Sequence, residues 1–167
     1  MPLICQPPPV EMQGLRLMCV NLTDMAPSKR AGATSQAVAN NLLVLRGSTG
    51  MSLRQLSGEL AERGVTISAQ SLSALEKGST AVTVDLLTAL AAVFGVSPIR
   101  LLVPESHDGF DPEVALTGTD STYPISLYEW LAGTSPLGMS EHISEVDPRV
   151  VTAFRERSQP AWMRRYR

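Results

Sequence analysis

The sequence predicts an all-α fold built on a bundle of five short helices between residues 35 and 104. Apolar residues recur there at spacings of three and four, the period of a helix that buries one face. Glycines or a proline follow each apolar stretch and mark where a helix ends. No segment alternates apolar and polar residues as a half-buried strand would. The 167 residues correspond to about one domain.

The first two helices are predicted from serine caps and glycine stops. Ser35 is expected to cap the first helix, which should end at Gly47 and Gly50. Ser52 is expected to cap the second, with Gln55 three residues later as its capping-box partner. The residues expected to face the core are Val38, Leu42, Leu45, Leu53, Leu56 and Leu60.

The other three helices are predicted in the same way. Ser68 is expected to cap a third helix that ends at Gly78. A fourth should run from about Thr83 to Phe94 and stop at Gly95. A fifth should follow Ser97, because the proline after it suits the first helical position. Their inward-facing residues are expected to be Leu72, Leu75, Leu86, Leu87, Leu90, Ala91, Phe94, Ile99, Leu101 and Leu102.

Outside the bundle the composition predicts less regular structure. Residues 1–34 contain a proline triplet and are expected to form a disordered N-terminal extension, with translation starting naturally at Met25. Residues 105–124 are acidic and lack periodicity, which predicts a linker. Residues 125–167 should form a tail with short helices, one around Trp130 and one opening at Asp147. Five arginines in the last thirteen residues either form a solvated tail or contact phosphate.

Charge and composition exclude several classes of protein. The net charge is −2, so bulk charge does not indicate a nucleic-acid partner. No apolar run reaches about eighteen residues, which excludes a membrane span. The N-terminus lacks the pattern of an export signal, and the two cysteines cannot build a disulfide framework. A cytoplasmic protein is therefore expected.

An enzyme is not expected either. His107 and His142 lack further ligands at metal-binding spacing. The chain has no nucleophile-elbow sequence and no glycine loop that would cradle a phosphate. We therefore expect no catalytic residue, no metal and no cofactor.

The functional signal lies in residues 51–78. There, a helix turns near Gly64 into a second helix that Leu72 and Leu75 would hold to the core. Small or amide-bearing side chains on the other face suit insertion into the major groove of DNA, where a Gln amide pairs with adenine N6 and N7. The first amides of the helix after Ser52 suit a phosphate oxygen. The outward set is Ser68, Ala69, Gln70, Ser71, Ser73, Ala74 and Lys77.

Residues 67–78, ISAQSLSALEKG, resemble the recognition-helix signature of the Xre/Cro phage-repressor family of helix-turn-helix proteins. Residues 38–46, 52–56 and 86–96 resemble its first, second and fourth helices. The resemblance covers about residues 35–104 and implies a lambda-repressor-like DNA-binding domain. The turn over residues 61–67 is longer than is typical of the family. It resembles a long-turn subgroup of bacterial regulators that continue into a tail with a Trp-containing helix, as residues 128–133 do here.

The resemblance also implies roles for single residues. Base contacts fall on Ala69, Gln70 and Ala74, while Glu76 is structural and Arg46 braces the domain. The full set implied to contact double-stranded DNA is Ser52, Ser68, Ala69, Gln70, Ser71, Ser73, Ala74, Lys77 and Ser79, with Thr80 beyond it.

The function implied is sequence-specific transcriptional regulation, as a repressor and as a homodimer that places two recognition helices about 34 Å apart. Candidate interface segments are residues 101–103 or the Trp130 helix. Trp130 either packs inside the tail or joins Tyr128 in a partner-docking face. The alternative is an antitoxin-like interaction module that binds a partner protein through its tail and DNA weakly.

Overall fold

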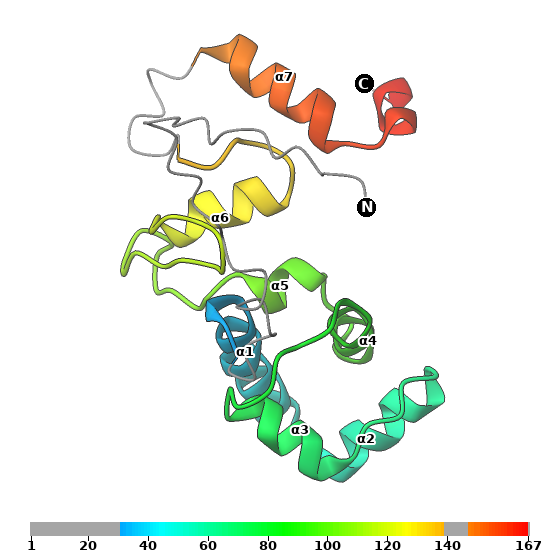
Figure 1. Cartoon of the computed structure of the whole chain (residues 1–167). Coiled ribbons are helices and arrows are strands. Elements are labelled where there is room, and N and C mark those ends of the chain that lie inside the picture. Colours follow the sequence, from blue (N-terminus) through cyan, green and yellow to red (C-terminus); the bar gives the residue numbers. More distant parts are fainter. Residues whose placement is uncertain (1–30, 139–146, 167) are drawn as a thin grey trace, which may run out of the picture.

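The computed structural model describes residues 31–138 and 147–166 and confirms the all-α fold (Figure 1). Within those residues there is no strand beyond one isolated antiparallel bridge between Val114 and Thr122. The expected start at Met25, and nearly all of the expected disordered arm, lie outside the described residues. The helices are α1 Ala33–Thr49, α2 Leu53–Glu62, α3 Ala69–Glu76, α4 Val84–Phe94, α5 Pro98–Leu102, α6 Pro124–Leu131 and α7 Pro148–Ser158, followed by a 3-10 helix, Ala161–Tyr166.

Most helix boundaries follow the predicted caps. The Ser52 hydroxyl accepts a hydrogen bond from the Gln55 backbone amide, and the Ser52 backbone amide donates one to the Gln55 side-chain oxygen, which completes the capping box. Ser68 and Thr83 cap α3 and α4 by the same kind of bond. Asp147 caps α7, whose first residue is proline.

For α1, the predicted start and the predicted stop at Gly47 were wrong, whereas the predicted stop at Gly50 is confirmed. The helix begins at Ala33 with Gly32 as its N-cap, and the Ser35 hydroxyl instead accepts a hydrogen bond from the Val82 amide at 3.2 Å. The Ser35 hydroxyl, which the local sequence pattern assigned to a helix cap, therefore forms a tertiary hydrogen bond instead. Gly47 lies inside the helix, which ends at Gly50 in the left-handed conformation with φ +66°.

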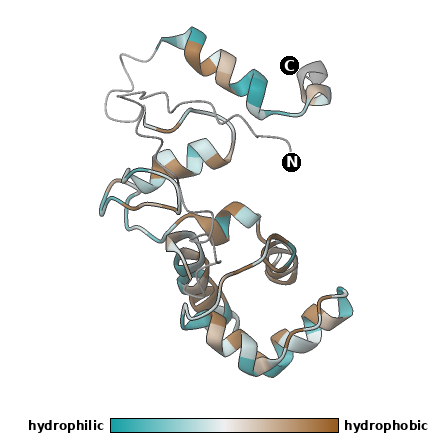
Figure 2. Cartoon of the chain, viewed as in Figure 1, coloured by the Kyte–Doolittle hydropathy of each residue, from teal (hydrophilic) through white to brown (hydrophobic). Residues whose placement is uncertain are grey.

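The five-helix bundle closes around one leucine-rich core. Leucines from α1 to α5 are fully or almost fully buried: Leu42, Leu56, Leu60, Leu72, Leu75, Leu90 and Leu101. Figure 2 shows hydrophobic residues concentrated along α4 and α5, while α2, α3 and α7 mix both kinds. Because α3 fully buries only Leu72 and Leu75, its exposed residues Gln70 and Ser71 remain accessible on the outer side of the helix.

The segment 105–123 differs from the linker that its composition predicts. Leu116 is only 6% exposed and packs with Ala37 of α1 and Leu127 of α6 in a second small core. Thr34 and Thr117 exchange two hydrogen bonds, each from a backbone amide to the other hydroxyl. The segment therefore packs against the start of α1. A few buried apolar residues hold it there, although its sequence has no periodic pattern.

The tail continues through α6 to α7, at the opposite end of the molecule from α2 and α3 (Figure 1). Trp130 is half-buried and packs against the Leu116–Leu127 core, while Tyr128 beside it is half exposed. Arg155 of α7 donates from Nε to the Thr134 carbonyl oxygen at 2.8 Å. Across the described ranges, every helix is too short or too polar to cross a bilayer.

Candidate nucleic-acid interface

The long turn between α2 and α3 is an ordered structure. After α2, the amides of Gly64 and Val65 bond to the carbonyls of Ala61 and Leu60 at 3.0 and 2.9 Å, and Gly64 has φ +82°. This is a Schellman end, which needs a left-handed residue where the helix stops. The chain then runs back along α2 toward α3 (Figure 1).

A side chain of α2 holds this returning segment in place. The Ser57 hydroxyl donates to the Ile67 carbonyl oxygen at 2.6 Å, directly before the cap of α3. Ile67 itself packs against the leucine core. The extra residues therefore lengthen the path between the helices without loosening the start of α3.

The N-terminus of α3 is held by two serines. The Ser68 hydroxyl accepts from the Ser71 amide at 3.0 Å, and the two hydroxyls lie 2.9 Å apart. Both residues remain exposed. Their hydroxyl oxygens and the first amides of the helix thus form one polar, solvent-facing end, which suits an anionic oxygen.

The outward face of α3 carries the residues that the sequence indicated. Gln70 is exposed, and no polar side chain or backbone group of the described residues binds its amide. Ala69, Ser73 and Ala74, whose side chains are all small, are half-buried. Ser79, just beyond the helix, donates to the Ala74 carbonyl oxygen at 2.7 Å.

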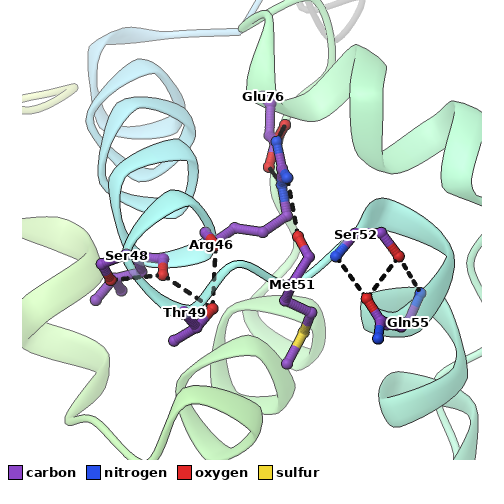
Figure 3. A network of polar contacts seen from close by, with 8 residues as sticks. Arg46, Ser48, Thr49, Met51, Ser52, Gln55 and Glu76 are labelled. Atoms are coloured by element: carbon purple, nitrogen blue, oxygen red, sulfur yellow. Dashed lines mark hydrogen bonds and ion pairs between the residues drawn. The ribbon is translucent and has the colours of Figure 1, made fainter.

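Arg46 joins the three elements that border this face (Figure 3). Its Nε and Nη2 donate to the two carboxylate oxygens of Glu76 at 2.6 and 3.0 Å, and its Nη1 donates to the Met51 carbonyl oxygen at 2.9 Å. The hydrogen bonds that Arg46 donates to the Glu76 carboxylate raise the pKa of Arg46. The pair ties the end of α1 and the entry to α2 to the end of α3, which fits the bracing role expected of Arg46 and the structural role expected of Glu76.

The same contact places Ser52 relative to α3. Ser52 follows Met51 directly, so Arg46 links the N-cap of α2 to the far end of α3. The predicted residues thus fall into three groups on α2, α3 and the segment after α3. These are the N-cap Ser52, the α3 face from Ser68 to Ala74, and the exit from α3 with Lys77, Ser79 and Thr80.

Most cations of the bundle are already paired. Arg46, Arg63 and Arg100 form ion pairs with Glu76, Glu59 and Glu105. Among the described residues of α1 to α5, this leaves Arg54 and Lys77 without an ion pair. Arg54 is an additional candidate that the sequence analysis did not single out. Its position in the sequence could have identified it, because Arg54 lies two residues after the cap Ser52 and the first turn of α2 was expected to face phosphate.

The fold and this face define a helix-turn-helix DNA-binding protein. A family model described as Helix-turn-helix matches residues 45–101, from the end of α1 to α5. The chain carries a helix-turn-helix domain of the Xre, lambda-repressor-like family, and so has the domain of a DNA-binding transcriptional regulator from a generally non-enzymatic family. No curated protein and no solved structure is significantly similar to the chain.

Proposed function

We propose that this protein is a sequence-specific transcriptional repressor that inserts α3 into the major groove of DNA and works as a homodimer in the cytoplasm. One observation carries the proposal. The exposed side of α3 is built from small side chains around a Gln70 side-chain amide that no other described residue binds, while Leu72 and Leu75 bury the opposite side. Such a surface lets the helix approach base edges closely.

Each residue has a role in this proposal. Gln70 reads a base edge, with Ala69, Ser73 and Ala74 beside it in the groove. Ser52 and Ser71 present hydroxyls and helix N-terminal amides to phosphates. Lys77 adds a charge at the exit from α3, where Ser79 and Thr80 are also exposed.

The dimer interface belongs outside the core. Leu101 is fully buried, so it is unavailable to a second copy, and Leu102 packs against the same core. We place the interface on the helix that contains Trp130, the other candidate segment, because Leu101 and Leu102 belong to the core.

Selection of genomic DNA fragments by the full chain, at physiological salt with competitor DNA, tests this function. We expect enrichment of a two-fold symmetric motif. A reporter driven from a promoter that carries the motif should be expressed more strongly when the protein is absent. A folded protein that enriches no motif would contradict the proposal, and co-purification with a partner protein would then support the antitoxin-like alternative.

Gln70→Ala should relax sequence preference at a single base pair. Loss of a bidentate contact costs about 1–3 kcal/mol of discrimination at that position. The measurement compares binding of the selected site and its single-base variants. Gln159→Ala, beyond α7 at the other end of the molecule, is the matched control and should leave the preference unchanged. Equal discrimination by Gln70→Ala and the parent would remove Gln70 from the base-reading set.

Lys77→Ala should weaken binding to all DNA sequences alike. A lysine that contacts phosphate contributes about one unit to the slope of log affinity against log salt. Titrations at several salt concentrations should show a slope shallower by about one per copy. The matched control is Arg63→Ala, because that arginine is already paired with Glu59. A slope that is unchanged by Lys77→Ala would place this lysine away from the DNA.

A further inference from the structure

A cavity of about 340 Å³ lies between the helix-turn-helix bundle and the tail, remote from α3. It is lined by α5, by the segment that follows it and by α6. Its apolar walls are Ile99, Val103, Pro104, Pro124, Ile125 and Tyr128. This volume is at the lower end of the range for small-molecule sites, about 300–1,000 Å³, and suits a ligand of the size of one amino acid.

The two walls of the cavity are held together by the backbone. The Ile125 amide at the start of α6 donates to the Gly109 carbonyl oxygen at 3.0 Å, and both residues line the cavity. On the other wall, the Val103 carbonyl oxygen accepts from the buried Asn41 side chain of α1 at 2.7 Å. Hydrogen bonds therefore support the cavity on both walls, as expected of a ligand site that is largely formed before binding.

One pair of opposite charges borders this apolar space. Arg100 and Glu105 form an ion pair, and both line the cavity. Their side chains are 37% and 51% exposed, so each keeps access to solvent and to a ligand. Arginine offers a planar fork of donors that matches a carboxylate, and glutamate accepts from an ammonium group.

We propose that this cavity binds a free amino acid with an apolar side chain. The ligand carboxylate would pair with Arg100 and its ammonium group with Glu105. Its side chain would fill the space among Val103, Ile125 and Tyr128. A zwitterion fits better than a singly charged molecule, because an anion would meet the Glu105 carboxylate and a cation the Arg100 guanidinium.

Titration calorimetry with the full chain tests this assignment without DNA, so its result is independent of the proposed repressor function. The first probes are L-phenylalanine and L-leucine, with L-glutamate as a polar comparison. We expect one site per chain for the apolar amino acids and at least about tenfold weaker binding of L-glutamate, which corresponds to about 1.4 kcal/mol. Two analogues then remove one charge each: 3-phenylpropanoate lacks the ammonium group and 2-phenylethylamine lacks the carboxylate. Each should bind at least about tenfold more weakly than L-phenylalanine.

Two variants assign the charges separately. The Arg100→Gln variant should bind L-phenylalanine no more tightly than it binds 2-phenylethylamine, because the ligand carboxylate has lost its partner. The Glu105→Gln variant should bind L-phenylalanine no more tightly than it binds 3-phenylpropanoate. Arg63→Gln, which alters an exposed ion pair on α2, is the matched control and should bind like the parent. Circular dichroism confirms that each variant is folded.

Three results would overturn the proposal. The first is no binding of either apolar amino acid at millimolar concentration. The second is equal binding of L-phenylalanine and both analogues. The third is unchanged discrimination in folded Arg100→Gln and Glu105→Gln proteins.

Discussion

Leu72→Ala is expected to lower the free energy of unfolding by about 3–5 kcal/mol, the range for a leucine truncated in a tight core. Leu72 is fully buried and is one of two residues by which α3 joins the leucine core. The truncation removes buried apolar surface and leaves a cavity that the helices around it fill only partly. This is a large part of the total stability of a domain, about 5–15 kcal/mol.

Urea titration followed by circular dichroism measures this loss, and the slope of the transition should stay the same. Leu43→Ala is the matched control, since Leu43 lies on α1 but is 49% exposed. It should change stability by no more than about 0.5 kcal/mol. A loss below about 1 kcal/mol for Leu72→Ala would contradict the placement of α3 against the core.

Arg46→Ala is expected to destabilise the protein by about 3 kcal/mol, because it leaves the Glu76 carboxylate of a largely buried ion pair without its partner. The Glu76 side chain is only 8% exposed, and that of Arg46 is 21% exposed. The substitution also removes the donor to the Met51 carbonyl oxygen. Because the pKa of Arg46 is raised, its contribution is present at lower pH and is lost only as the pH rises through that raised pKa.

A double-mutant cycle separates the pair from its surroundings. Glu76→Gln and the combined variant complete the cycle, and we expect a coupling energy of about 1–3 kcal/mol by chemical denaturation. Arg63→Ala, which breaks the exposed pair with Glu59, should cost only about 0.3–0.5 kcal/mol. Similar losses from Arg46→Ala and Arg63→Ala would show that the Arg46 network does not brace the domain.

The helices of the bundle follow from local chemistry, so the sequence is enough to predict them. The capping box at Ser52 and Gln55, the cap at Ser68 and the left-handed glycine after α4 all act within one helical turn. The leucines at spacings of three and four then identify the buried faces. The outward face of α3 could be predicted because it consists of the residues left on the helix surface once Leu72 and Leu75 are assigned to the core.

Features that join distant parts of the chain could not be predicted in this way. The local pattern at Ser35 predicts a helix cap, but in the structure its hydroxyl accepts a hydrogen bond from the Val82 amide. The composition of residues 105–123 predicts a linker, but in the structure Leu116 packs with Ala37 and Leu127. The family resemblance implied a structural role for Arg46 and for Glu76 separately, but it predicted neither their ion pair nor the bond from Arg46 to the Met51 carbonyl oxygen.

The difference has a physical cause. Helix caps, glycine stops and apolar periodicity depend on interactions between residues at most a few positions apart, and these are present in the order of amino acids. The docking of residues 105–123, the cavity between α5 and α6 and the ion pair of Arg100 with Glu105 beside it depend on how separate segments pack. Apolar burial is non-directional, so it favours compactness without specifying which segments meet. That choice is made by shape and hydrogen bonding once the helices are assembled.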